Sequence, residues 1–229
     1  MTIKQNRTIT IRHQIMARAN KGLLGGLSGR ISNLVAGSWK GINYIRSRPS
    51  AFHDPKTKAQ IQQRNRFKLV LEFIRPVKDF IKLSFRQYAI NMTEYNKAMS
   101  WNMKNAIAGV PPDLHLDYSV VLLSHGDLTP PKNAQYTLTS NMALSVQWDD
   151  NSGQGSAKPT DYALLAAYNE NKQHAVWIAN GPTRKNKAAL LQLPSDYQGD
   201  TIHVYFAFAR RDYTISSDSI YLGYLPFSN

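Results

Sequence analysis

Residues 201–210 read TIHVYFAFAR, and this stretch decides the fold class of the C-terminal half of the chain. Apolar side chains recur at every second position, which is the period of a β-strand. The same period returns from residue 117 onward in six further stretches separated by turn-rich segments: 117–123, 143–148, 161–169, 174–179, 188–193 and 219–225. Short strands at this spacing predict an antiparallel β-sandwich.

Two features of this half resemble fibronectin type III and immunoglobulin-like sandwiches. ALSVQW (143–148) places Trp148 where such domains bury a tryptophan on the second strand. LPSDYQGD (193–200) is similar to the corner that leads into the sixth strand, with Leu193 and Tyr197 at the tyrosine-corner positions. The resemblance covers about residues 133–225, and it implies a fold without implying a function.

Upstream of the sandwich the pattern is helical. Thr57 followed by Gln60 is a capping-box pattern, which predicts a helix from about 58 to about 88. Its apolar face holds Phe67, Val70, Ile74, Val77, Ile81, Phe85 and Tyr88. Pro76 should kink or split this helix, because proline removes a backbone hydrogen bond. Thr93 begins a second helix, and the two helices are expected to pack as an antiparallel pair.

The segment GSWKGINYIRSRP (37–49) predicts a β-hairpin with strands at about 30–39 and about 42–48. Lys40-Gly41 forms its turn and Pro49 ends its second strand. Counting alternate positions places Trp39 and Ile45 in an internal core, under the first helix. The same count turns Tyr44, Arg46 and Arg48 outward, toward a partner.

Three stretches of the N-terminal half resemble a family of uncharacterised bacterial proteins that is classed as a domain of unknown function. They are GLLGGLSGRISNLVAGSWKGINYIRSRP (22–49), DPKTKAQIQQRNRF (54–67) and MTEYNKAMSWNMKNAI (92–107). The resemblance covers nearly the whole chain from Lys21 onward, and the family carries over no functional residue. The DPKTKAQIQQR segment is also similar to phage-type structural proteins.

The predicted fold class is therefore α+β. A poorly structured extension (1–20) precedes a Gly-rich hairpin with two packed helices (21–116) and an antiparallel, fibronectin type III-like sandwich (117–229). The chain has no Cys, which excludes disulfides, thiolate metal sites and cysteine nucleophiles. It shows no Sec-type signal peptide and no apolar run of roughly 18 residues. We therefore expect a soluble protein that is cytoplasmic or associated with an assembly.

Charge is the strongest bulk signal. The net charge is +13, and residues 1–116 hold 20 Lys and Arg against 5 Asp and Glu. Five cations of the first helix fall on one face, separate from its apolar face. Together with the hairpin they give the predicted partner-binding set: Lys40, Tyr44, Arg46, Arg48, Arg64, Lys68, Arg75, Lys82 and Arg86. Such a set faces an acidic partner, or it is a solvated surface that keeps the protein soluble.

Patterns that support catalysis are missing from the sequence. None of its six His has the spacing of a zinc site, and His125 in SHGD has no sequence signature of a triad. Asp149 and Asp150 follow the Trp148 strand without the spacing of a calcium loop, so they are expected in an ordinary polar turn. We therefore predict that the protein is not an enzyme and uses no cofactor or metal.

Three functions remain open. The first is a structural or interaction protein, a component of a phage-like or surface assembly that binds a protein partner or itself. The second is a nucleic-acid-binding protein that uses the basic half, with Trp39 and Tyr44 as stacking groups. The third is a carbohydrate-binding sandwich whose aromatic platform would consist of Trp177, Tyr168, Tyr205 and Tyr221.

Overall fold

The computed structural model describes residues 18–20, 26–39, 42–49, 51 and 54–226. The chain divides into two compact units, residues 1–56 and 57–229, which we call the sheet unit and the sandwich unit. The expected division after residue 116 differs, because the helices pack on the sandwich and share a core with it. Residues 1–17 of the expected extension lie outside the described residues, whereas Arg18–Asn20 forms a strand.

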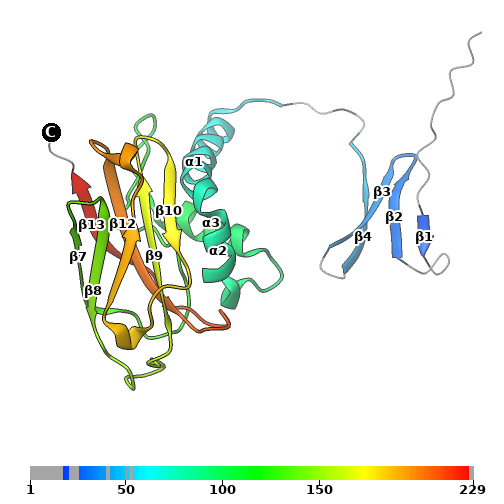
Figure 1. Cartoon of the computed structure of the whole chain (residues 1–229). Coiled ribbons are helices and arrows are strands. Elements are labelled where there is room, and N and C mark those ends of the chain that lie inside the picture. Colours follow the sequence, from blue (N-terminus) through cyan, green and yellow to red (C-terminus); the bar gives the residue numbers. More distant parts are fainter. Residues whose placement is uncertain (1–17, 21–25, 40–41, 50, 52–53, 227–229) are drawn as a thin grey trace, which may run out of the picture. The chain divides into compact units, whose positions relative to one another are not determined.

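The described part of the sheet unit is one antiparallel sheet of strands β1 (Arg18–Asn20), β2 (Gly26–Ile31), β3 (Leu34–Trp39) and β4 (Ile42–Ser47). The strands follow one another in sequence order (Figure 1). The hairpin of β3 and β4 is confirmed. The strand expected at about 30–39 is instead two strands, because the chain turns at Ser32, whose φ of 52° is left-handed.

The helices of the sandwich unit begin as expected. Helix α1 (Lys58–Ile74) has Thr57 as its N-cap, and the capping box with Gln60 is present. Pro76 splits the long helix: a 3-10 turn, η1 (Arg75–Val77), separates α1 from α2 (Lys78–Ser84). A further 3-10 turn, η2 (Arg86–Tyr88), precedes α3 (Glu94–Asn105), which is capped by Thr93 and packs against both α1 and α2.

Two sheets make up the β-layers of the sandwich unit. One has the order β10-β9-β12-β13, and the other has the order β11-β8-β7. The strand bounds are β7 Lys132–Leu138, β8 Ala143–Asp149, β9 Tyr162–Asn169, β10 His174–Ile178, β11 Ala188–Gln192, β12 Thr201–Ala209 and β13 Ile220–Pro226. All pairings are antiparallel. A small pair, β5 (Ile107–Ala108) with β6 (His115–Leu116), follows α3. Short 3-10 turns, η3 (Arg184–Asn186) and η4 (Ser195–Tyr197), flank β11.

The strand expected at 117–123 is absent from the structure. Asp117 accepts hydrogen bonds from the backbone and hydroxyl of Ser119, which fixes a turn there. Val121, Leu122 and Leu123 are buried without pairing in a sheet. The backbone N–H of Leu122 donates to Asn102 Oδ1, and that of Leu123 donates to Ser219 Oγ. Buried side chains therefore satisfy these N–H groups where a neighbouring strand otherwise would.

Two apolar cores lie on opposite faces of the four-stranded sheet. Between the two sheets pack Trp148, Leu193, Tyr197, Phe206 and other apolar residues. On the other face the helices cover the sheet (Figure 1), and the core there is built from both sets of elements, including Phe73, Phe80, Tyr168 and Tyr205. Strand β9 is buried on both faces, which explains its continuous apolar run at 163–168.

A buried ion pair ties together the loops at one end of the sandwich. Arg184 is fully buried, and its Nε donates to Asp161 Oδ2 at 3.3 Å. The other carboxylate oxygen of Asp161 accepts from Arg210 Nη1 at 2.9 Å. Arg184 also donates to Asn151 Oδ1 at 2.5 Å and stacks on Phe208, with the guanidinium carbon 3.8 Å from the ring centroid. Each charge therefore has a partner, which a buried ion requires.

Candidate functional site

The sheet unit presents two chemically different faces. The register pairs Trp39 with Ile42, Gly37 with Tyr44, and Val35 with both Arg30 and Arg46. Paired residues share a face of a sheet. One side, which we call the cationic face, thus carries Trp39, Ile42, Tyr44, Arg46 and Arg30. The other, which we call the aliphatic face, carries Ile31, Leu34, Ala36 and Ile45.

This register corrects the expected grouping of Trp39 with Ile45. Counting alternate residues treats 39–45 as one straight strand, whereas the chain reverses between β3 and β4 and places Trp39 opposite Ile42. Trp39 and Ile45 were also expected to be core residues. They are 43% and 57% exposed.

Large apolar side chains are exposed on both faces of this sheet. The exposed fractions are Ile31 53%, Leu34 42%, Ile42 60% and Tyr44 46%. Among the residues of β1–β4 whose side chains the structure describes, Ala36 is the one that is buried. Tyr44 lies against Gly37, where an added Cβ would come within 3.0 Å of the phenol ring. Glycine at position 37 thus allows an aromatic ring to lie flat on the neighbouring strand.

The predicted hairpin residues lie together on and beside the cationic face. Tyr44 and Arg46 are exposed on β4, and Arg48 is exposed just beyond it. Arg48 and Arg30 border a hollow of about 420 Å³ at the β2–β3 turn. The backbone N–H of Arg48 donates to Asn33 O at 2.6 Å, which holds this end of the sheet together. Lys40 lies outside the described residues.

The five predicted helix cations are all exposed, but they do not lie on one continuous helix. Arg64 and Lys68 belong to α1, and the others follow the break in η1, α2 and η2: Arg75, Lys82 and Arg86. Lys68 pairs with Glu72 at 3.7 Å, and Arg86 donates to Asp212 O at 3.2 Å. The hairpin set belongs to the sheet unit and the helix set to the sandwich unit.

The aromatic residues considered for a sugar platform belong to the core under the helices. Tyr168 and Tyr205 are 3% and 1% exposed, and Trp177 and Tyr221 pack against the same cluster. Phe73 of α1 lies over Tyr168 with ring centroids 4.5 Å apart. The hydroxyl of Tyr205 donates to Tyr118 O at 2.8 Å. These rings are therefore covered by α1 and its neighbours and do not form an exposed platform.

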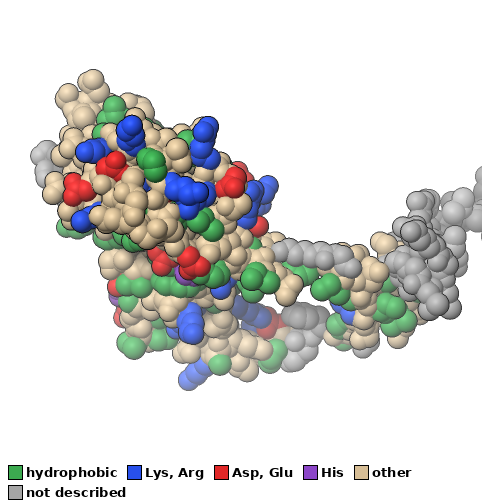
Figure 2. All heavy atoms as spheres, turned by 90° about the horizontal axis from the view of Figure 1, so that it is seen from below, with side chains coloured by type: hydrophobic (Ala, Val, Ile, Leu, Met, Phe, Trp, Pro, Cys, Tyr) green, Lys and Arg blue, Asp and Glu red, His purple; other side chains and the backbone are tan. Residues whose placement is uncertain are grey.

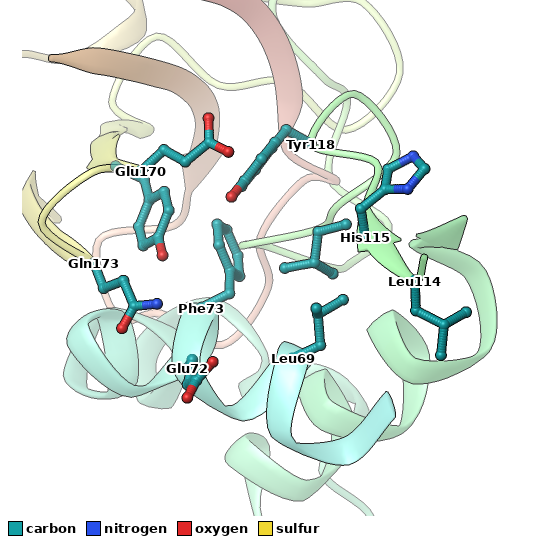
Figure 3. A pocket seen from close by; sticks show the side chains of 10 residues that line it. Leu69, Glu72, Phe73, Leu114, His115, Tyr118, Glu170 and Gln173 are labelled. Atoms are coloured by element: carbon teal, nitrogen blue, oxygen red, sulfur yellow. The ribbon is translucent and has the colours of Figure 1, made fainter. Parts of the chain in front are cut away.

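A cavity of about 350 Å³ opens beside this aromatic cluster. It is bordered by α1, by the segment around β6, and by the end of β9 with the turn that follows (Figure 3). In that view Glu170 and Glu72 lie on opposite sides of Phe73, and the ring of His115 points away from Phe73. Sequence reasoning missed this cavity, because its lining comes from three segments that meet only through folding.

Negative charge and burial shape the electrostatics of the cavity. Burial raises the pKa of the Tyr118 phenol, and the Glu170 carboxylate beside it raises that pKa further. Burial, then Glu170 and Glu72, raises the pKa of Tyr168 to about 12. Behind Tyr118, His203 stacks on its ring at 3.8 Å between centroids, and Glu170 Oε2 lies 3.2 Å from His203 Nε2. Both phenols are therefore neutral hydrogen-bond donors at neutral pH.

Within the part of the chain that the structure describes, no group of three His, Asp or Glu side chains is placed to hold a metal ion. The histidines there have ordinary partners instead: His125 with Asp218 at 2.6 Å, and His174 with Tyr197 at 2.5 Å. The described helices include none that is long and apolar enough to cross a membrane. Asp150 caps its own turn by accepting from Ser152, as expected for a polar loop.

Comparison with known proteins matches most of the chain to a protein family. The profile of a family of unknown function (DUF6266) matches residues 26–223, which span most of both units. No curated protein and no solved structure matches the chain.

Proposed function

The chain belongs to the family of unknown function DUF6266, and we propose that it is a non-enzymatic interaction protein whose sheet unit binds a partner. The observation that carries this proposal is the sheet of β1–β4, with large apolar side chains exposed on both faces. A sheet of this size needs a packed face to be stable, because backbone pairing alone does not offset the entropy of ordering the strands. A partner surface would supply the missing layer.

The edge strand of the sheet is a second surface through which the same partner could bind. Strand β4 lies at the end of the order β1-β2-β3-β4, and all of its residues are exposed. An edge strand presents unpaired N–H and C=O groups to which another strand can add. An assembly component, of the phage-like or surface kind, would use both the edge and the aliphatic face. The placement of the protein inside such an assembly is part of this proposal.

Charge defines the partner further. Residues 1–53 contain nine Lys and Arg and no Asp or Glu, whereas residues 57–229 hold 18 Lys and Arg against 14 Asp and Glu. Figure 2 shows acidic and basic side chains interspersed on one face of the sandwich unit. The excess positive charge is thus concentrated in the sheet unit. Two copies of that unit would repel each other, so an acidic partner is favoured over self-association through this surface.

The test is a single substitution on the aliphatic face. Ile45→Lys places a charge at the centre of the proposed interface, and Leu190→Lys is the matched control, because Leu190 is 63% exposed on the sandwich unit. Affinity purification from the native host should identify a partner that rebinds the purified wild-type chain and the control but not Ile45→Lys. A strictly monomeric protein with no such partner, or equal binding by all three, would contradict the proposal.

A nucleic acid is the second candidate partner, favoured by the composition of the cationic face. Arg30 and Arg46 lie on the same face as Trp39 and Tyr44, and surfaces of this composition bind phosphates while bases stack on the rings. We expect a labelled oligonucleotide to shift at ~50 mM salt and to be released as the salt concentration rises. The logarithm of the association constant falls as the logarithm of the salt concentration rises, and Arg46→Ala should make this negative slope shallower by about 1. An unshifted oligonucleotide would remove this candidate.

We also propose that the sandwich is of the fibronectin type III kind. Seven strands divide into sheets of three and four, Trp148 is buried on the second of them, and Leu193 and Tyr197 are buried at the corner before β12. The Tyr197 hydroxyl bonds to His174, whereas the tyrosine corner of this fold bonds to backbone. An experimental structure that superposes on this class of domain strand by strand would test the assignment.

A further inference from the structure

The cavity beside α1 has walls suited to an organic ligand. Phe73, Tyr118 and Tyr168 contribute three rings with centroids 4.5 to 6.0 Å apart. Leu69, Leu114 and Leu116 add apolar surface. A volume of about 350 Å³ is at the lower end of the range for small-molecule sites. The cavity therefore accommodates a small organic group rather than a bare ion.

Two carboxylates are among the polar groups that line the cavity. Among the described residues, those that line it include Glu72 and Glu170 but no Lys or Arg, in a chain of net charge +13. The side chains of Glu72 and Glu170 are 35% and 48% exposed, so each can reach a ligand without losing contact with water. Gln173 adds an amide oxygen at the same rim. These groups accept hydrogen bonds from N–H donors, and aromatic faces attract cations.

We propose that this cavity binds an ammonium or guanidinium group on a short apolar chain. The cation would pair with the carboxylate of Glu170, and its hydrocarbon part would contact Phe73 and the tyrosine rings, with Glu72 adding negative charge on the far side of Phe73 (Figure 3). The proposal does not depend on the sheet unit, because every lining residue belongs to the sandwich unit. Two sources can supply this chemistry: a free small amine, or a Lys or Arg side chain of another polypeptide.

The experiment titrates the full chain with n-butylguanidinium and n-butylammonium and follows binding by calorimetry and by NMR shifts of the lining residues. Butanoate and 1-butanol are the anionic and neutral controls of the same length. We expect saturable binding of the cations only. Glu170→Gln should weaken it roughly tenfold, because a charge-assisted hydrogen bond becomes a neutral one. Glu94→Gln, a carboxylate on α3 outside the cavity, should leave it unchanged.

A second arm distinguishes the two sources. A capped alanine peptide with one central Arg is compared with the same peptide carrying citrulline. Tighter binding of the Arg peptide than of butylguanidinium assigns the site to a protein side chain, and the reverse assigns it to a free amine. The proposal is overturned if no cation saturates the site, if butanol binds as well as the cations, or if Glu170→Gln and Glu94→Gln bind alike. The thermal midpoint of each variant verifies that it is folded.

Discussion

At the scale of single residues, the least replaceable side chain is Arg184. It is completely buried and is the shared partner of Asp161, Asn151 and the Phe208 ring. Arg184→Ala should lower the free energy of unfolding by about 3–5 kcal/mol, because the buried carboxylate of Asp161 loses one of its two cations. Urea denaturation measures this loss. Lys185→Ala, an exposed neighbour in the same turn, should change stability by less than about 0.5 kcal/mol. Equal effects would contradict the structure.

His203 makes stability depend on pH. Burial lowers the pKa of its imidazole, although the neighbouring Glu170 acts in the opposite direction. The unfolded chain, with a histidine pKa near ~6.5, then takes up a proton before the folded chain does. The free energy of unfolding should therefore fall as the pH is lowered below ~6.5, since the unfolded state binds more protons there.

Denaturation at neutral and mildly acidic pH tests this dependence. His203→Gln removes the titrating group and keeps a hydrogen-bonding side chain beside Glu170 and Tyr221, so it should flatten the pH profile. His115→Gln, at an exposed site, should retain the wild-type profile. The prediction fails if the two substitutions have the same effect.

Single residues were the hardest to place from the sequence. Trp148 was correctly expected in a buried position, because it lies in a strongly patterned strand. Trp39 was placed on the wrong face, since strand register depends on where the chain turns. Nothing in the sequence indicated that Arg184 and Asp161 form a buried ion pair. They lie 23 positions apart, with β9 and β10 between them, and only the closed sandwich brings them together.

At the scale of elements, we expect the same substitution to have different effects at the two N-caps, Thr57 of α1 and Thr93 of α3. The first turns of α1 are exposed, whereas α3 buries Ala98, Met99 and Asn102. Losing a Thr cap costs about 1 kcal/mol of helix stability. Thr57→Ala should therefore speed amide exchange of residues 58–61 roughly fivefold and leave global unfolding almost unchanged.

Thr93→Ala should instead lower the free energy of global unfolding by about 1 kcal/mol, because α3 cannot fray without exposing its core residues. Hydrogen exchange and urea denaturation of both variants separate the two effects. A global loss in Thr57→Ala, or a purely local one in Thr93→Ala, would contradict these assignments.

Elements with strong local signals were predicted well. The capping box, the Pro76 break and six of the seven expected strands of the C-terminal half are present. The missed strand β7 (132–138) is an edge strand with no fully buried residue, and its alternation is only three apolar positions long: Ala134, Tyr136 and Leu138. The apolar segment 117–123 was misread for a different reason: its burial comes from packing in the core with the helices, where Asn102 and Ser219 accept hydrogen bonds from its backbone in place of a neighbouring strand.

At the scale of the whole molecule, the two units should be separable. Exposed Lys56 and Lys58 lie at the boundary between residues 1–56 and 57–229. Brief digestion with trypsin should leave a resistant fragment that begins at residue 57 or 59. Its thermal midpoint should lie within a few degrees of that of the full chain, because both large cores belong to the sandwich unit. A drop of more than ~5 °C would show that the sheet unit supports the fold.

The α+β class followed from the change of period along the chain, and the structure confirms it at that level. The boundary between the two units at residues 56 and 57 could not be predicted from the sequence, because the apolar face of a helix does not reveal which surface it will cover. The charge asymmetry was expected to mark residues 1–116, whereas the strongest excess lies in residues 1–53. The cavity was beyond prediction, since two of its three rings, Phe73 and Tyr168, come from a helix and a strand that are distant in sequence.

The position of the exposed sheet of β1–β4 near the start of the chain also affects when a partner can bind. Its residues leave the ribosome before any part of the sandwich unit, since they precede it in the chain. Because Ala36 is the one buried side chain among those described in its strands, the nascent segment would gain its missing layer only when the partner that we propose is present. Assembly would then be cotranslational, and ribosomes still translating the sandwich unit would carry the partner with them.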